Sequence, residues 1–379
     1  MIINVAASTR FHLANLVVEL ENMGHDVRFY SYVPPSRLKA YGLSKKSIVP
    51  LFWIFIPVIA LLRLSGRAAW SIKLEWFFLD FIVGHFMRRC DVFIAMSAIY
   101  VDSFRRAREK FGAKLFLERG SMHALSLKEL YDRAGLERNR TYGNFYYALV
   151  SDYAIRREQQ MYEYVDVISI PSDHVAKSFV NNGISVEKLF VNPYGENLTR
   201  FPPTQLDQSG KRIYDVIMVG NWSWMKGCDL LIEACRMGGI SLLHVGAHSM
   251  TFPEGEQFHS VGTVDQREIT NYMAQARVFV LPSRQEGLAL VLVQAALSGL
   301  PIVCSENSGG TTIRRMINDD TNVHIVDRLD VACLHDTLQK ALVSAKKQVG
   351  TRKYADNLTQ LFSAEQYALR YHQRLVEIL

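Results

Sequence analysis

The chain has 379 residues, of which 49% are hydrophobic and 21% charged, so it holds enough apolar material for packed cores and is neither disordered nor fibrous. Its length exceeds that of a usual single domain, and we expect two. The net charge of +6 is unevenly spread, because residues 1–150 hold 21 Lys and Arg against 12 Asp and Glu, whereas residues 151–379 hold 22 against 25. The two halves are therefore expected to meet different partners.

The cysteines and the first residues indicate a protein of the cytoplasm. The cysteines are odd in number and never form a C-x-x-C pair, which favours reduced thiols over a disulfide framework or a zinc site; they are Cys90, Cys228, Cys235, Cys304 and Cys333. The opening residues, MIINVAAS, lack the basic region and long apolar run of a signal peptide and predict a strand instead.

The first part of the chain alternates between short apolar runs and helical periodicity. Residues 13–20 repeat Leu and Val at helical spacing, and Gly24 ends that helix. Strands are predicted at residues 2–6, 27–30, 91–95, 114–117 and 167–171. Alternating strands and helices require crossover connections, so we expect a parallel sheet.

One apolar segment in this part leaves three interpretations open. Residues 47–62 (SIVPLFWIFIPVIALL) carry no charge, and Lys45, Lys46, Arg63 and Arg67 surround them. A transmembrane helix usually needs about 20 apolar residues, and two prolines interrupt this run. A buried core segment and a surface that dips into lipid headgroups are the alternatives. The basic flanks favour the membrane surface, since they are attracted to anionic lipid.

A break near residues 196–213, rich in Pro, Gly and polar residues, separates the first part from a second α/β alternation. Strands are predicted there at residues 215–220, 242–246, 278–281 and 301–304, and helices at 227–236, 288–298, 331–344 and 364–379. The expected fold class is α/β, with two doubly wound, Rossmann-like domains and a cleft between them. Ligands of such sheets bind at the carboxyl ends of the strands.

Two strand–loop–helix turns in the second part have residues suited to an anion. The segment VGNWSWMKGCDLLIEA places Gly220 at a strand end and Lys226-Gly227 at a helix start, where backbone N–H groups are free. Taken alone, such a turn more often reflects ordinary turn chemistry than a phosphate site. In LPSRQEGLALVLVQAALSG, Glu286-Gly287 closes the loop before another helix. Two such turns together favour a diphosphate ligand.

These segments resemble the GT-B glycosyltransferases of the large retaining family 4. The resemblance covers nearly the whole chain and is carried by VELENMGHDV, VISIPSDHVAKSFVNNGISVEKLFVNPYGENLTRF, the two turns above and Gly309-Gly310. It implies an acceptor-binding domain of residues 1–200, on which a closing helix of residues 360–379 packs, and a nucleotide-sugar-binding domain of residues 201–359.

The resemblance also implies a donor site in the second domain. Lys226 would bind the diphosphate and stabilise the leaving group, and Glu286 would hold hydroxyls of the transferred sugar. Gln294 stands where the family usually has a glutamate bound to ribose. Backbone amides of Gly287, Leu288 and Ala289 would face phosphate or sugar, and further donor contacts are expected at Gly220, Asn221, Gly227, Gly246, Val264 and Ser283.

Departures from the family pattern occur at three places. Gln294 lacks the charge of the usual glutamate but can still accept and donate a hydrogen bond. Asn221 replaces an arginine that many members use on the phosphates. The first loop reads Ala-Ala-Ser-Thr-Arg instead of paired glycines, and its Ser8 and Thr9 are expected on the acceptor side.

The segment LFLERGSMHA resembles a subset of the family with an Arg-Gly-Ser and a histidine in this loop. We place Arg119, Ser121 and His123 on the acceptor side, with His123 as a catalytic candidate that touches the sugar or the acceptor. A lone histidine is more often structural, and that interpretation stays open for His123. His12, His25 and His174 are expected to be structural.

No metal and no cofactor are expected. The chain has no D-x-D sequence and no His/Cys cluster with metal spacing. Positive charge and helix N-termini would then stabilise the leaving group. No carboxylate stands out as a covalent nucleophile.

The expected function is a metal-independent, retaining glycosyltransferase of hexosyl type in bacterial surface polysaccharide or glycan synthesis. Its partners would be a nucleotide-sugar donor, a saccharide or polyprenyl-linked acceptor, and a peripheral membrane surface at the inner face of the plasma membrane. A nucleic-acid partner is not expected, because residues 105–110 form a solvated basic helix face without stacking aromatics. The alternatives are a catalytically weakened binding or scaffold protein, and an epimerase or phosphorylase of the same fold.

Overall fold

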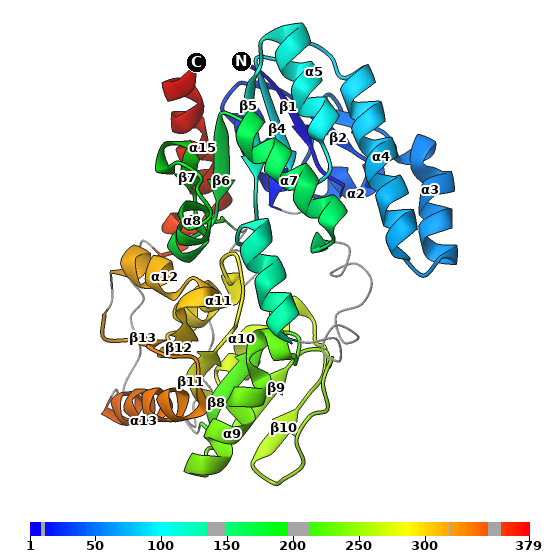
Figure 1. Ribbon diagram of the computed structural model, residues 1–379. Helices are drawn as coiled ribbons and strands as arrows, with labels where there is room; N and C mark the ends of the chain where they lie inside the picture. Colours follow the sequence, from blue (N-terminus) through cyan, green and yellow to red (C-terminus); the bar gives the residue numbers. More distant parts are fainter. Residues whose placement is uncertain (9–11, 135–148, 196–211, 319, 348–357) are drawn as a thin grey trace. The chain divides into compact units, whose positions relative to one another are not determined.

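Two compact units make up the chain in the computed structural model (Figure 1). The first comprises residues 1–171, 176–196 and 364–379, and the second residues 172–175 and 197–363. The predicted boundary at residue 200 lies outside the described residues, and residues 172–175, which we expected in the first domain, belong to the second unit. The structure describes residues 1–8, 12–134, 149–195, 212–318, 320–347 and 358–379.

The first unit is built on a parallel sheet of seven strands in the order β3-β2-β1-β4-β5-β6-β7. The strands are β1 (Ile2–Ala6), β2 (Asp26–Ser31), β3 (Ile48–Pro50), β4 (Val92–Met96), β5 (Lys114–Glu118), β6 (Val167–Ile170) and β7 (Leu189–Val191). The five predicted strands are present within one residue at each end, and β3 and β7 were not predicted. The strand order reverses between β1 and β4, where Val5 pairs with both Phe29 and Ile94.

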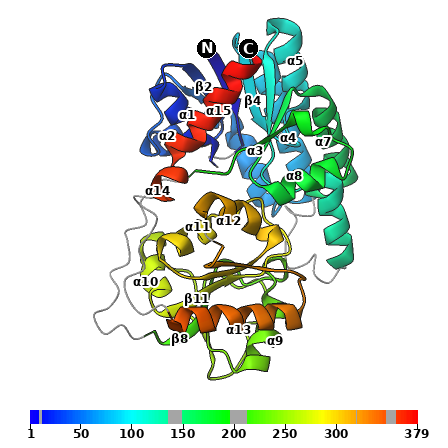
Figure 2. The ribbon, with the colours of Figure 1, turned by 90° about the vertical axis from the view of Figure 1, so that its left-hand side faces the viewer.

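Helices cover both faces of this sheet. They are α1 (Leu13–Asn22), α2 (Pro35–Ala40), α3 (Phe52–Leu64), α4 (Ala69–Phe86), α5 (Val101–Phe111), α7 (Asp152–Tyr164), α8 (Asp173–Val180) and α15 (Ala364–Ile378). The last helix lies beside α1 (Figure 2), and its Tyr367, Tyr371 and Leu375 are fully buried in the same core as Leu16 and Leu20. A segment about 350 residues further along the chain thus completes the first hydrophobic core.

The apolar segment at residues 47–62 forms β3 and most of α3. Leu51, Phe55 and Leu62 are buried, whereas Trp53 and Ile54 are 68% and 60% exposed. The buried-core interpretation therefore holds only for one side of the segment. Among the described residues, no helix is both long and apolar enough to cross a membrane.

The second unit has a parallel sheet of six strands in the order β10-β9-β8-β11-β12-β13. Its strands are β8 (Tyr214–Val219), β9 (Leu242–Val245), β10 (Phe258–Ser260), β11 (Ala276–Leu281), β12 (Ile302–Ser305) and β13 (Val323–Val326). Its helices are α9 (Cys228–Gly238), α10 (Ile269–Met273), α11 (Leu290–Leu297), α12 (Gly310–Ile317), α13 (Val331–Lys347) and α14 (Leu358–Leu361). Both units are thus doubly wound α/β domains, as predicted.

The order of this second sheet positions the candidate site. It reverses between β8 and β11, which are hydrogen-bonded neighbours although two strands separate them in sequence. Loops leaving the carboxyl ends of two such strands diverge to opposite faces, and ligands bind in the crevice between them. The turns that hold Lys226 and Glu286 follow these two strands.

Candidate functional site

Lys226 and Glu286 meet at the point where the strand order of the second unit reverses. Lys226 ends a 3-10 turn (Trp224–Lys226) that follows β8, and Glu286 lies in the loop between β11 and α11. Their side chains form an ion pair between Nζ and Oε1. The Ser283 hydroxyl also donates to Glu286 Oε1, at 3.2 Å. Both charged side chains keep about a fifth of their surface exposed, 24% for Lys226 and 19% for Glu286, so a ligand can reach them.

The absence of a side chain at Gly227 lets these two turns touch. Gly227 has a φ of 73°, and a Cβ built there would lie 2.1 Å from the carbonyl oxygen of Pro282. A residue other than glycine would have to push the two turns apart. The glycine after Lys226 therefore brings the lysine next to the Glu286 loop.

Arg284 ties the same two turns together. Its backbone N–H donates to Met225 O at 2.7 Å, and its guanidinium stacks 4.1 Å from the centre of the Trp224 ring. The guanidinium also makes a two-pronged bond to Asp229, at 2.6 and 2.7 Å. Such a planar fork has little freedom once formed, so Lys226 and Glu286 are supported by a rigid base. Arg284 was not among the predicted site residues.

Residues 172–175 hold the Glu286 loop from its other side. His174 Nε2 donates to the carbonyl oxygen of Glu286 at 2.7 Å, and the Ser172 hydroxyl donates to that of Gly287 at 2.5 Å. Burial lowers the pKa of His174, so the ring is neutral at pH 7. We expected a structural histidine here, and it is one that positions the Glu286 loop across more than 100 residues of sequence.

Two helix N-termini face this region without a capping side chain. Gly227 precedes α9 and Ala289 precedes α11, and neither helix has a side-chain cap. Uncapped N–H groups at a helix start are suited to an anion. Three of these amides, however, already donate to the protein: that of Ala289 to Ser308 O at 3.1 Å, that of Gly227 to Trp224 O at 2.9 Å and that of Cys228 to Ser223 O at 3.2 Å. Within the described residues, the amides of Gly287 and Leu288 have no such partner.

Gln294 lies in the middle of α11 and is only 8% exposed. Most of the Gln294 side chain therefore packs inside the second unit. No hydrogen bond of its side-chain amide is found within the part of the chain that the structure describes. The amide atoms of Gln294 are not among the fully buried polar atoms that lack a partner, so burial does not by itself mark a ligand-binding group, and a contact of Gln294 with ribose stays a prediction.

The turn after β8 is closed on its far side by residues that follow β9. Asn221 and the Ser249 hydroxyl bond to each other, at 2.8 and 3.1 Å. His244 Nε2 donates to Gly220 O at 2.9 Å, and burial lowers the pKa of His244 to about 4. Gly246 lies so close to Gly220 that a Cβ would come within 2.0 Å of its carbonyl oxygen. The Asn221 side chain is thus bonded to Ser249, and it supplies no positive charge where the family pattern has an arginine. Val264 is half-buried, one loop further along.

Arg119 of the first unit is buried and bound within that unit. It forms an ion pair with Glu158, which is fully buried, at 3.0 Å, and donates to Ser97 Oγ at 3.1 Å. A guanidinium committed to a buried carboxylate stabilises the loop rather than binding a ligand directly. Of the other acceptor-side residues, Ser8 and Ser121 are half-buried, and Thr9 lies outside the described residues.

His123 is also part of the interior of the first unit. Its ring packs between Tyr162 and Phe179, with ring centres 4.9 and 5.2 Å away. Its Nδ1 accepts the backbone N–H of Leu125 at 3.3 Å, and burial together with Arg119 lowers its pKa to about 4. These contacts are structural ones, and a contact of His123 with the sugar stays a prediction.

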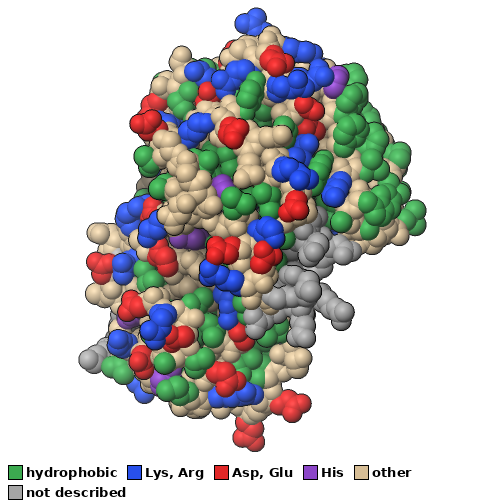
Figure 3. Space-filling view, viewed as in Figure 1, with side chains coloured by type: hydrophobic (Ala, Val, Ile, Leu, Met, Phe, Trp, Pro, Cys, Tyr) green, Lys and Arg blue, Asp and Glu red, His purple; other side chains and the backbone are tan. Residues whose placement is uncertain are grey.

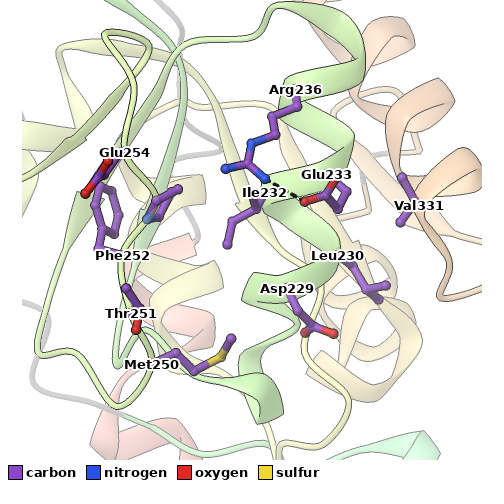
Figure 4. A pocket seen from close by; sticks show the side chains of 11 residues that line it. Asp229, Leu230, Ile232, Glu233, Arg236, Met250, Thr251, Phe252, Glu254 and Val331 are labelled. Atoms are coloured by element: carbon purple, nitrogen blue, oxygen red, sulfur yellow. Dashed lines mark hydrogen bonds and ion pairs between the residues drawn. The ribbon is translucent and has the colours of Figure 1, made fainter.

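A separate surface pocket of about 660 Å³ lies between α9 and residues 250–254 (Figure 4). Arg236 and Glu233 pair on one wall, and Phe252 faces them from the loop. None of the predicted donor residues lines it.

Within the described ranges, no cluster of three or more His, Cys, Asp and Glu side chains could hold a metal ion. The expectation of a metal-free site remains a prediction.

Sequence comparison adds a family match for the second unit. Residues 214–344 match the family described as "Glycosyl transferases group 1". A relative is the putative colanic acid biosynthesis glycosyltransferase WcaL of Salmonella typhimurium, 26% identical over 222 residues, which are 50% of this chain and 54% of that protein. The chain thus matches about half the length of this curated relative.

Solved structures extend the likeness to the full chain. Sucrose-phosphate synthase from Thermosynechococcus elongatus aligns over 100% of this chain and 99% of its own, with a TM-score of 0.65 and 15% identity. Anabaena HepE, solved with UDP and glucose, aligns over 99% of both chains with a TM-score of 0.59 and 12% identity. The fold is the GT-B type, and together with the family match these comparisons support a glycosyltransferase.

Proposed function

We propose that this protein transfers a sugar from a nucleotide-sugar donor to a saccharide or lipid-linked saccharide, in the synthesis of a bacterial surface polysaccharide. The observation that carries the proposal is the Lys226–Glu286 pair at the reversal point of the second sheet. It places one cation and one carboxylate beside two uncapped helix N-termini. The family match of residues 214–344 and the UDP-bound neighbour agree with a donor of this class.

The site suits a diphosphate leaving group. Lys226 and the N–H groups of Gly287 and Leu288 supply positive charge and donors, and these are fixed before the reaction. Donors that need no rearrangement stabilise developing negative charge more strongly than water does. The protein would thereby stabilise the charge that grows on the phosphates as the sugar leaves, in a reaction that does not need a metal.

Glu286 suits the transferred sugar. Its carboxylate can accept hydrogen bonds from sugar hydroxyls once Lys226 turns to the phosphates. The Ser283 hydroxyl bonds to the side chain of Glu286 and His174 to its carbonyl oxygen, so both its side chain and its backbone are held in place. We propose a hexosyl donor and retention of the anomeric configuration, as the resemblance to family 4 implies.

The experiment that tests this function has two steps. A thermal-shift screen with UDP-, GDP-, ADP- and dTDP-sugars identifies the donor, because a ligand that binds only the folded protein raises its melting temperature. The stabilising donor is then incubated with membrane lipid extract and with soluble saccharides, in buffer with EDTA. Transfer in EDTA is expected. Donor binding without transfer to any acceptor would instead support a binding or scaffold role.

A further inference from the structure

The first unit has an apolar surface that none of the site chemistry uses. All six exposed Trp and Phe side chains of the described residues lie on α3 and α4, together with three exposed aliphatic ones; the nine are Trp53, Ile54, Ile56, Leu64, Trp70, Phe77, Phe78, Phe81 and Phe86. We call them the α3–α4 face. Figure 3 shows hydrophobic side chains gathered along this edge of the unit. Monomeric proteins rarely expose a continuous patch of this kind without a partner for it.

The helix pattern shows that this surface is built into the fold. α3 has 13 residues, a single charge at Arg63 and only two buried side chains, so it is apolar nearly all round. Along α4, Phe77, Phe81 and His85 follow each other at four-residue spacing, and their rings stack with centres 6.2 and 4.0 Å apart. The opposite side of α4 packs into the unit through Ile72, Leu79 and Val83, which are fully buried. The exposed row is therefore a second apolar side of a helix whose core side is already satisfied.

Within residues 45–89, the charges on the surface have one sign. The only acidic residues from 45 to 89 are Glu75 and Asp80, which are 2% and 3% exposed. Glu75 accepts a hydrogen bond from Tyr32 at 2.5 Å and lies 3.8 Å from the guanidinium of Arg67, which stays half exposed. Asp80 accepts from Ser103 and from Arg157. The basic residues of the same stretch are all exposed: Lys45, Lys46, Arg63, Arg67, Lys73, Arg88 and Arg89.

The basic residues also lie next to the most exposed apolar ones. Arg63 precedes Leu64, which is 87% exposed, and Arg67 lies in the turn before Trp70, which is 56% exposed. Aromatic side chains bury well at the boundary between headgroups and acyl chains, and arginine can extend from there to lipid phosphates. This is the composition of a surface that lies on an anionic bilayer.

We infer that the α3–α4 face is a membrane-docking surface that inserts Trp and Phe side chains into the headgroup region of an anionic bilayer. α3 is about 20 Å long, shorter than the hydrocarbon core of about 30 Å, so it lies in the interface and does not span. A second copy of the chain fits less well. A symmetric dimer would place the same basic face against itself and bring like charges together.

Flotation of the full chain with vesicles tests this inference. The protein is expected to float with vesicles of phosphatidylcholine containing about a third phosphatidylglycerol, to bind pure phosphatidylcholine weakly, and to be released by salt. The two exposed tryptophans are Trp53 and Trp70, while Trp76, Trp222 and Trp224 are buried. Brominated lipids should therefore quench part of the tryptophan emission on binding.

Two variants separate insertion from charge. Trp53→Glu together with Phe77→Glu should lower the vesicle affinity at least tenfold. Trp53 lies in the first turn of α3, where a carboxylate favours the helix, and Phe77 is 55% exposed, so both changes are expected to leave the fold intact, which circular dichroism checks. Arg63→Glu should weaken binding to anionic vesicles by more than about fivefold, the effect of losing one charge near the surface. The controls are Met237→Glu and Lys340→Glu, exposed positions of the second unit.

The flotation results test membrane docking without any activity measurement. A failure of the docking inference can therefore be told apart from a failure of the proposed function. Absence of vesicle binding at low salt would overturn it, as would binding that the α3–α4 variants and the controls reduce equally. Light scattering is run on the same samples. A stable dimer that Trp53→Glu dissociates would assign the face to a second copy instead, and would also overturn the inference.

Discussion

Lys226 and Glu286 are 60 residues apart in the sequence and form an ion pair where β8 and β11 lie side by side. With no donor bound, each partner satisfies the charge of the other. In the proposed function, a diphosphate that takes over Lys226 would also release Glu286 for the sugar. The same two groups would then serve as an internal pair in the empty site and as two ligand contacts in the occupied one.

Removing the cation should weaken phosphate binding more than it disturbs the fold. Lys226→Ala is expected to reduce the affinity for the nucleoside diphosphate by about tenfold to a hundredfold, because a hydrogen bond to a charged group contributes about 1.5–3 kcal/mol. Isothermal titration calorimetry measures the loss. Lys340→Ala, an exposed lysine on α13, is the matched control and should bind as the parent does. Equal affinities of the Lys226 variant and the parent would remove Lys226 from the site.

Neutralising the carboxylate should separate binding from transfer. In Glu286→Gln the ion pair with Lys226 is absent, so it does not have to be broken when a nucleoside diphosphate binds. A partly exposed ion pair contributes about 0–1 kcal/mol, and the diphosphate should therefore bind as tightly as before or a few-fold more tightly. Transfer should fall by at least about tenfold, as a charged acceptor for the sugar is lost. Glu256→Gln, on the exposed loop before β10, serves as control. Tighter diphosphate binding with full transfer would show that Glu286 does not touch the sugar.

Gln294 offers a test that distinguishes a ligand contact from a structural residue. Gln294→Leu removes no hydrogen bond within the described residues, so the free energy of unfolding should change by less than about 1.5 kcal/mol. Nucleotide affinity should nevertheless fall by about tenfold if the amide binds ribose. Inorganic pyrophosphate, which lacks ribose, should bind the variant and the parent equally. A variant that loses stability but keeps nucleotide affinity would make Gln294 a structural residue.

Acid should destabilise the protein through its buried histidines. The folded-state pKa of His123 and of His244 is about 4, below the unfolded value of about 6.5, so the unfolded chain binds more protons between these values. The contribution of each neutral histidine to the free energy of unfolding is complete above pH 6.5 and is lost as the pH falls toward 4. By pH 5 the free energy of unfolding should have fallen by about 2 kcal/mol for each histidine. Denaturant unfolding at pH 7 and pH 5 measures it. His123→Asn keeps an acceptor for the Leu125 amide and should flatten the profile; an unchanged slope would contradict the assignment.

The contact at Gly227 should be sensitive to a single methyl group. Gly227→Ala places a Cβ against Pro282 O and also strains a positive φ, so it should lower both stability and nucleotide affinity. Gly239→Ala is the matched control, because it has a φ of 58° and no atom within 4 Å of the new Cβ. The control should lose about 1 kcal/mol of stability and none of the affinity. If both variants bind nucleotide equally well, the closeness of the two turns is unimportant for the site.

Local patterns in the sequence located most strands, the helices α1, α9, α11, α13 and α15, and both site turns. Apolar runs and glycine positions act over a few residues, so β1, β8 and the Lys226-Gly227 turn could be located from neighbouring residues alone. The resemblance carried by the turns then indicated Glu286 and Gln294 as donor contacts. The short strands β3, β7, β10 and β13 were missed, because three or four residues hold too little pattern.

The tertiary structure decided which of these residues meet. Strand order brings β8 beside β11 and so joins Lys226 to Glu286, and it recruits His174 and Arg284, for which no local signal exists. It also placed Trp53, Ile54 and Ile56 of α3 on the surface. Composition alone could not distinguish this exposed arrangement from a buried one. Local periodicity reports the conformation of a segment, whereas the pairing of strands and the covering of faces depend on contacts between residues far apart in the chain.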